Sequence, residues 1–167
     1  LYEVMKKYPY IAIPAFQLHD FLMRGHSPFT VAERELISAY VSGLNACSFC
    51  YRGHVAAAEL WGIEEGVMDA LMEDVDTAPV DEKLKPVLRY VRKLNNTPGQ
   101  MVQKDADAVY EAGWDEDALM EAVGICALFN FMNRIADGAG VVAGNTKTTL
   151  TKRWASYTEN LLNYGFE

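Results

Sequence analysis

The sequence predicts an all-α fold of about seven helices, and three observations carry this prediction. Apolar residues recur at helical spacing in one segment after another. Short runs of glycine, proline and asparagine separate these segments, and no convincing period-2 alternation indicates a strand. The 167 residues suffice for one compact domain, with no long linker. We therefore expect a single domain over residues 1–167, with a core at 15–145 and a C-terminal helix at 146–167.

Three signals place the first helices. One helix should begin near Pro14, because proline is tolerated in the first turn, and should stop at Gly25. Thr30 and Glu33 are spaced as a capping box, in which each side chain accepts a hydrogen bond from the other residue's backbone N–H. They open a second helix, which should end near Asn45, a good terminator.

The following helices are shorter. Cys47 opens a helix that should end at Gly62, and a short one follows over about 64–72. The pair Asp81-Glu82 places acid at the next helix start, where the helix dipole favours negative charge. Pro86 must then lie in the first turn or bend this helix.

The last third of the chain contains the longest helical pattern. A short helix over 104–112 ends at Gly113. Asp115 then caps a helix from Glu116 to about residue 136, and a final amphipathic helix is expected over 149–164.

Composition excludes several classes of function. The net charge of −8 and the pI of about 4.9 argue against a nucleic-acid partner, because the chain would repel phosphate. We find no apolar run that approaches the roughly 18 residues needed to span a bilayer, and no signal peptide. Three cysteines are too few for a disulfide scaffold, so a reducing cytoplasm is the expected location.

The residues that carry chemistry lie in one stretch of twenty. Cys47 and Cys50 form a CxxC pair, and His54 follows on the same helical face. A helix start favours a thiolate, so we expect a lowered thiol pKa here. Two thiols at this spacing can close a disulfide, and the histidine can hold the proton that a leaving alkoxide needs. The pattern indicates redox chemistry at sulfur.

Glu35 can join this site only if the chain folds back on itself. On one continuous helix it would lie about 18 Å from Cys47. If the chain turns near Asn45 and Ala46, the mismatch between Glu35 and His54 along the helix axes falls to about 4.5 Å. The carboxylate could then orient the imidazole and raise its basicity. The mechanism itself therefore predicts a helical hairpin.

These residues resemble the motif of a known family. Glu-x11-Cys-x2-Cys-x3-His is the motif of the AhpD-like alkylhydroperoxidases, within the carboxymuconolactone decarboxylase superfamily, and residues 129–138 look like a C-terminal segment of its peroxidase-related subgroup. The resemblance implies an all-α fold and a homo-oligomer, either trimer-based or dimeric. It implies that Cys50 attacks a peroxide, that Cys47 resolves it, and that Glu35 and His54 relay the proton.

The same resemblance implies that no cofactor or metal is needed beyond the cysteine pair, and that a dithiol or a protein serves as the reductant. The best-studied branch carries a histidine just before the second cysteine and uses a dihydrolipoyl protein. This chain has Phe49 there, so its electron donor and the control of its thiol pKa stay open.

Other interpretations of the cysteine pair compete with the peroxidase. A zinc site would need a fourth ligand beside Cys47, Cys50 and His54, which His19, His26 or Glu35 could supply. A redox sensor or a disulfide-exchange adaptor would use the same thiols on a protein partner. A decarboxylase-type lyase is a further alternative, although relatives with that activity generally lack the CxxC pair.

Some polar and apolar residues outside the motif also need an interpretation. We expect His19 and His26 to be ordinary surface or loop histidines, and Cys126 to be a buried small hydrophobe. A polar stripe lies in the long apolar helix, and we favour an internal Arg–Asp and asparagine network that fixes helix packing or a subunit interface over a lining of a substrate or partner pocket. The residues of this stripe are Asn130, Asn133, Arg134 and Asp137.

Overall fold

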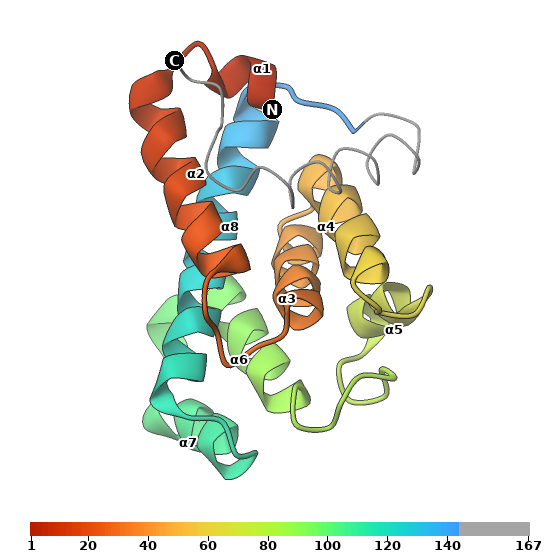
Figure 1. Ribbon diagram of the computed structural model, residues 1–167. Coiled ribbons are helices and arrows are strands. Elements are labelled where there is room, and N and C mark those ends of the chain that lie inside the picture. Colours follow the sequence, from red (N-terminus) through yellow and green to blue (C-terminus); the bar gives the residue numbers. More distant parts are fainter. Residues whose placement is uncertain (144–167) are drawn as a thin grey trace.

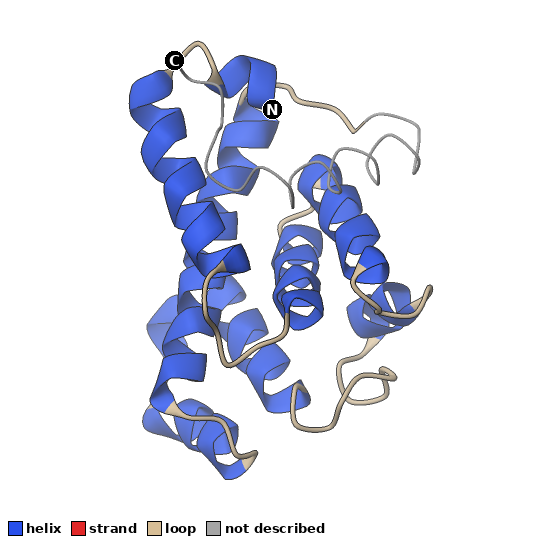
Figure 2. Ribbon diagram, viewed as in Figure 1, coloured by secondary structure: helices blue, strands red, loops and turns tan. Residues whose placement is uncertain are grey.

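The computed structural model describes residues 1–143, and all regular structure in this part of the chain is helical (Figures 1 and 2). The described residues form eight α-helices and one short 3₁₀-helix. Their bounds are α1 Tyr2–Met5, α2 Pro9–Arg24, α3 Val31–Leu44, α4 Ser48–Leu60, α5 Val67–Glu73, α6 Lys85–Asn96, η1 Pro98–Gln100, α7 Gln103–Glu111 and α8 Glu116–Gly138. The all-α prediction is confirmed, and the predicted C-terminal helix lies outside the described residues.

The start of the second helix was predicted wrongly. α2 begins at Pro9 rather than near Pro14, so Pro14 lies inside the helix. Pro9 occupies the first turn, where its missing N–H costs nothing. Pro14 removes the hydrogen bond to the carbonyl of Tyr10 four residues earlier, but Tyr10 is on the exposed surface, where that carbonyl is close to solvent.

Two more helix starts were predicted wrongly, and these two lie later in the chain than predicted. α6 begins at Lys85 because Asp81 forms a turn instead, in which its side chain accepts a hydrogen bond from the backbone N–H of Lys83 at 2.8 Å. Pro86 lies in the first turn, as predicted. α5 begins after Gly66, whose φ of +88° is left-handed and cannot belong to a right-handed helix.

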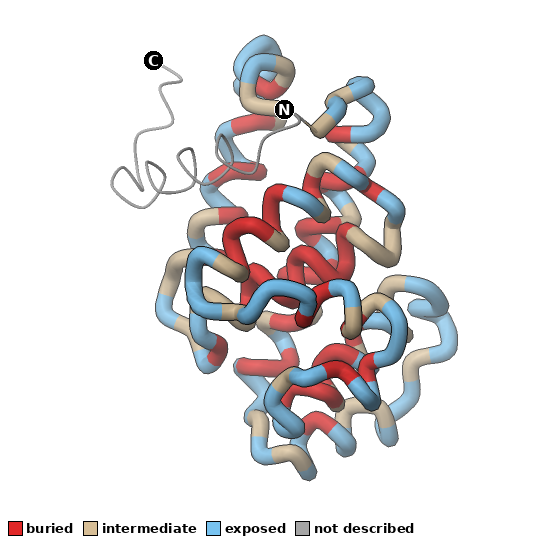
Figure 3. The backbone as a smooth tube through the Cα atoms, turned by 90° about the vertical axis from the view of Figure 1, so that its right-hand side faces the viewer, coloured by how far each residue is buried: buried red, intermediate tan, exposed pale blue. Residues whose placement is uncertain are grey.

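α3 is the central helix of the described fold. It packs against α2, α4, α5, α6 and α8, and most of its residues are buried. Figure 3 shows the buried positions gathered along the inner helices, with exposed positions around them. The predicted capping box starts this helix: Thr30 accepts from the N–H of Glu33, and the Glu33 carboxylate accepts from the N–H of Thr30.

α8 corrects the expectation that no segment is long and apolar enough to cross a bilayer. By length and composition this 23-residue helix passes that test. Half of its most apolar window is nevertheless buried inside the structure. It packs against α2, α3, α4, α6 and α7, which is the environment of a core helix.

The helical hairpin predicted from the motif is present. α3 and α4 lie side by side in the middle of the molecule and are joined by a short turn (Figure 1). Asn45 ends α3, Ala46 takes a left-handed φ of +56°, and Cys47 is the N-cap of α4. This reversal places residues of α3 directly opposite residues of α4.

Candidate active site

The hairpin brings Glu35 and His54 into direct contact. The Nδ1 atom of His54 lies 2.6 Å from Oε2 of Glu35, and both side chains are buried. A short contact between an imidazole and a carboxylate in a water-poor setting fixes the ring and its tautomer. His54 also packs edge-on against Phe129 of α8, with ring centroids 4.5 Å apart, so its orientation is held from two sides.

Glu35 is a buried carboxylate with a second partner. Its other oxygen, Oε1, lies 2.5 Å from the guanidinium of Arg24, at the end of α2. Burial raises the pKa of Glu35, but His54 and Arg24 outweigh that effect and leave the pKa below its ordinary value. Glu35 is therefore ionised at neutral pH, with one partner on each oxygen.

His19 is not the surface histidine that we expected. It is buried beside the Glu35–His54 pair, with its ring centroid 6.2 Å from that of His54 and 6.1 Å from that of Phe129. Burial is the main cause that lowers its pKa, so it is neutral at pH 7. His26 is exposed, as predicted.

The CxxC pair lies one turn before His54 on α4. Cys47 is fully buried and Cys50 is 5% exposed, and both thiols are free. The two cysteines pack with Ala136 of α8, and the partly buried Leu1, Phe49 and Val141 pack against this cluster. The sulfurs thus lie in an apolar environment at the N-terminus of a helix.

This environment overturns the expectation of a lowered thiol pKa. Burial, followed by the neighbouring Cys47 and Asp137, raises the pKa of Cys50 to about 12, against a hydrogen bond from Asn133. Burial also raises the pKa of Cys47, although a hydrogen bond to its sulfur from the backbone N–H of Cys50 acts in the opposite direction. The helix terminus does act in the predicted direction, but the loss of water around the sulfur is the larger effect.

The polar stripe of α8 anchors the hairpin turn. Asn133 accepts a hydrogen bond from the side-chain amide of Asn45 at 2.9 Å and donates to the hydroxyl of Ser42 at 3.1 Å. Asn130 donates to Asn95 of α6 at 2.7 Å, and Asn95 donates to Asn45 at 3.1 Å. This network confirms the structural interpretation for Asn130 and Asn133, because it ties three helices to the turn that opens the CxxC helix.

The stripe also reaches the sulfurs, which agrees with the pocket-lining alternative that we had ranked second. The Asn133 backbone carbonyl lies 3.9 Å from Sγ of Cys47, and its side chain hydrogen-bonds to Cys50. Asp137 interacts with both thiols. Arg134 donates to Asn130 instead of pairing with Asp137. Asn133 and Asp137 are spaced at i and i+4 on α8, and that spacing was the available signal.

The other predicted elements are placed as follows. Cys126 is buried and hydrogen-bonded to Asn130, which agrees with the prediction of a small buried residue. Within residues 1–143, no group of three or more histidine, cysteine, aspartate or glutamate side chains could hold a metal ion. His19 lies beside His54 and Glu35 rather than beside the two cysteines, so these side chains do not converge on one point where a metal ion could bind.

Comparison with known proteins supports the fold. No family model matches the chain, and no curated protein matches it. Among solved structures, an uncharacterised peroxidase-related protein from Ralstonia eutropha, described as an alkylhydroperoxidase AhpD core, superposes with a TM-score of 0.81 at 22% identity. That match covers 89% of this chain and 76% of the other.

Two further solved structures are similar. An uncharacterised peroxidase-related protein from Silicibacter sp. has a TM-score of 0.74 at 23% identity, over 81% of this chain and 71% of its own. A protein of unknown function from Agrobacterium tumefaciens, for which an AhpD antioxidant defence role is suggested, has a TM-score of 0.71 at 19% sequence identity. That match covers 86% of this chain and 97% of the other. The chain therefore has the AhpD-like fold of the peroxidase-related proteins.

Proposed function

We propose that this protein is a thiol-dependent peroxidase that reduces hydrogen peroxide or alkyl hydroperoxides through a disulfide cycle of Cys47 and Cys50. The observation that carries the proposal is the 2.6 Å contact between Glu35 and His54, one helical turn beyond the CxxC pair. A buried thiol with a pKa of about 12 is almost entirely protonated at neutral pH, so it needs a base close by. The oriented imidazole is that base.

In the first step, His54 accepts the proton of the Cys50 thiol. The sulfur attacks the terminal oxygen of the peroxide, an S–O bond forms and the O–O bond breaks. Cys50 is oxidised to a sulfenic acid, which keeps the hydrogen of the peroxide group. The leaving alkoxide takes the proton from His54 and departs as an alcohol, or as water if the substrate is hydrogen peroxide.

In the second step, the sulfur of Cys47 attacks the sulfur of the Cys50 sulfenic acid. An S–S bond forms, the S–O bond breaks, and the departing hydroxide combines with the Cys47 proton to give water. An external dithiol then supplies two electrons and two protons to return both thiols. Cys50 is the better candidate for the attacking sulfur because it is the more exposed of the two and lies closer to His54 along α4.

The surroundings of the sulfurs favour a small substrate. Leu1, Phe49 and Val141 pack against the sulfur cluster, so an apolar hydroperoxide finds apolar contacts there. A redox sensor or a disulfide-exchange adaptor would have to bring a partner protein's disulfide to the sulfurs. That alternative has no need of the buried Glu35–His54 pair, which favours the peroxidase, and the CxxC pair argues against a decarboxylase-type lyase.

Peroxide turnover by variants tests the proposal. Wild-type protein is mixed with cumene hydroperoxide and dithiothreitol, and peroxide loss is followed. We expect turnover in the wild type, its loss in Cys50→Ser, and strong slowing in Cys47→Ser, because the sulfenic acid is then left unresolved. The matched control is Cys126→Ser, which removes a buried thiol outside the site and should keep turnover. Full activity of Cys50→Ser would show that another sulfur reacts.

A further inference from the structure

We propose that Arg24 is a positioning residue for the proton relay, which holds Glu35 as a carboxylate so that His54 can act as a base. The inference rests on the proposed function. Glu35 is shared between two helices: Oε2 contacts Nδ1 of His54 at 2.6 Å, and Oε1 contacts the guanidinium of Arg24 at 2.5 Å. The arginine is therefore the third member of a chain of contacts, Arg24–Glu35–His54, that reaches the CxxC helix.

The geometry holds Arg24 in this place. It is the last residue of α2, and its Nη1 donates a hydrogen bond to the carbonyl of Met23 at 2.7 Å, while Nη2 faces Glu35. Its side chain is 7% exposed and that of Glu35 is fully buried. An ion pair with so little water is screened weakly, so the loss of one charge changes the other strongly.

The carboxylate needs a cation because burial by itself would protonate it. Burial is the largest influence on the pKa of Glu35 and acts upward, and the contacts with His54 and Arg24 reverse it. If Glu35 became a neutral acid, it would no longer stabilise a proton on the imidazole. The base that takes the Cys50 proton would then be weakened without any change in the cysteines.

The charges around Glu35 come from several helices. α2 contributes Arg24 and the neutral His19, and α4 contributes His54. Arg34, on α3 itself, lies 3.9 Å from Glu121 of α8 and acts on Glu35 only through space, without a contact between the two side chains. Arg24 is the cation in direct contact with the carboxylate, so its removal is the change to which Glu35 should respond most.

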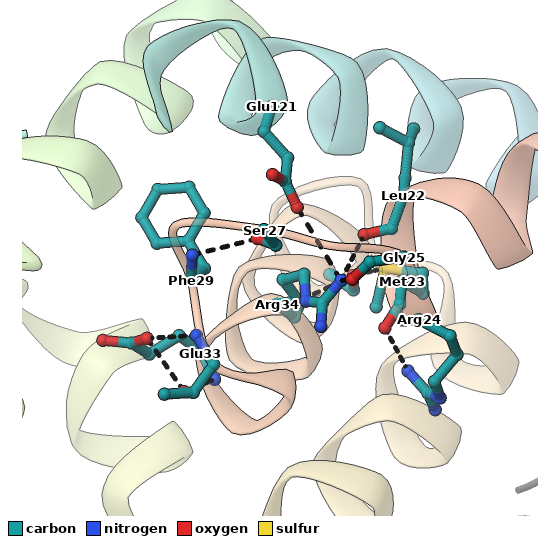
Figure 4. A network of polar contacts seen from close by, with 11 residues as sticks. Leu22, Met23, Arg24, Gly25, Ser27, Phe29, Glu33, Arg34 and Glu121 are labelled. Atoms are coloured by element: carbon teal, nitrogen blue, oxygen red, sulfur yellow. Dashed lines mark hydrogen bonds and ion pairs between the residues drawn. The ribbon is translucent and has the colours of Figure 1, made fainter. Parts of the chain in front are cut away.

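Arg34 provides a matched control. Like Arg24 it is a buried guanidinium next to the α2–α3 connection, and it donates to the carbonyls of Leu22 and Gly25 at 3.1 and 3.0 Å (Figure 4). Removing it costs comparable packing and hydrogen bonds, but leaves both contacts of Glu35 in place. A merely structural role for Arg24 predicts that the two arginine variants behave alike.

The first measurement is the pH dependence of kcat/KM for peroxide reduction in wild type, Arg24→Gln, Arg24→Lys and Arg34→Gln. Loss of a cation in contact with a carboxylate shifts its titration by about one to three pH units. We expect the acidic limb of Arg24→Gln to move to higher pH by that amount, Arg24→Lys to restore most of it, and Arg34→Gln to keep the wild-type limb. A uniformly lower rate with an unmoved limb in Arg24→Gln would overturn the proposal.

The second measurement does not depend on peroxide turnover. The infrared band of a protonated carboxyl group, assigned to Glu35 by its loss in Glu35→Gln, is followed with pH. The proposal requires this band to be absent from the wild type at neutral pH, and to appear at higher pH in Arg24→Gln than in the wild type. A protonated Glu35 in wild-type protein at neutral pH overturns it. If peroxide is not consumed at all, the proposed function fails while this titration still decides the role of Arg24.

Discussion

At the scale of single residues, the loss of water around the sulfurs decides the chemistry of the cysteine pair. A thiol at a helix terminus would ordinarily be a better acid, yet the pKa of Cys50 is raised to about 12. Asp137 adds to this effect on both thiols, because a nearby negative charge disfavours a thiolate. In the proposed mechanism, thiols that stay protonated at rest resist indiscriminate oxidation, and Cys50 reacts only when His54 takes its proton.

Asp137→Asn tests this electrostatic contribution. Removal of the negative charge should lower the thiol pKa values, so more thiolate exists at a given pH and iodoacetamide should alkylate Cys50 faster. One pKa unit corresponds to tenfold more thiolate, and we expect less than about tenfold because Asp137 is exposed and its charge is screened. Alkylation is measured by mass spectrometry between about pH 7 and 9.

The control for this variant is Asp117→Asn, at the opposite end of the same helix, which should leave the alkylation rate unchanged. Slower alkylation of Cys50 in Asp137→Asn would show that the aspartate supports the thiolate, which is the opposite of the predicted effect.

The sequence was a good guide to some site residues and a poor guide to others. Glu35 and His54 were predicted because a motif and a turn signal together demanded their contact. Arg24 was missed because a lone arginine at a helix end has no pattern that points to a carboxylate eleven residues later. His19 was placed at the surface because a single histidine carries no periodicity, and only tertiary packing buries it.

At the scale of helices, the α3–α4 turn is the element on which the site depends. Ala46 reverses the chain in this turn with a left-handed φ of +56°. This conformation is unfavourable by about 1 to 2 kcal/mol for a residue with a side chain, and nearly neutral for glycine. Asn45, on one side of the turn, is tied to α8 through Asn133. The network and the cap of α4 at Cys47 therefore hold a strained residue in place.

Ala46→Gly should raise the free energy of unfolding by about 1 kcal/mol. This net gain is the steric strain that glycine relieves at this φ, less the loss that comes from glycine's greater freedom in the unfolded chain. Urea unfolding followed by circular dichroism measures the change. The matched control is Ala112→Gly, at the end of α7 with φ −75°, where glycine should destabilise. A loss of stability in Ala46→Gly would contradict the strain assigned to the turn.

Helix existence was easier to predict than helix starts. The capping box at Thr30 and the cap at Asp115 act within one turn, so both starts were predicted correctly. The starts of α2, α5 and α6 depended on which of several prolines, glycines or aspartates the chain would use. That choice is made by packing of the whole helix, which local sequence does not contain.

At the scale of the whole molecule, a homo-oligomer stays a prediction. Several large apolar side chains of α2 are exposed in the single chain, Tyr10 and Phe21 most of all. We expect them to lie at a subunit contact, since exposed apolar surface favours association. Sedimentation equilibrium should show a dimer or a trimer-based assembly, and Phe21→Ser should weaken it, whereas a wild-type monomer at all concentrations would contradict this expectation.

Three further expectations also stay predictions, because the fold does not test them: the domain limits, the cytoplasmic location and the reductant. What the fold does determine is the order of the parts. A hairpin turn places an acid and a base together, the base follows the cysteines on one helix, and α8 covers the sulfurs. The central claim is that this order makes Cys50 the sulfur that a peroxide oxidises.

The most direct test is to identify that sulfur. Cys47→Ser protein is treated with one equivalent of cumene hydroperoxide in the presence of dimedone, which traps sulfenic acids, and the product is mapped by peptide mass spectrometry. The account predicts one dimedone adduct, on Cys50. An unmodified Cys50, whether the adduct is found on Cys126 or nowhere, would contradict it.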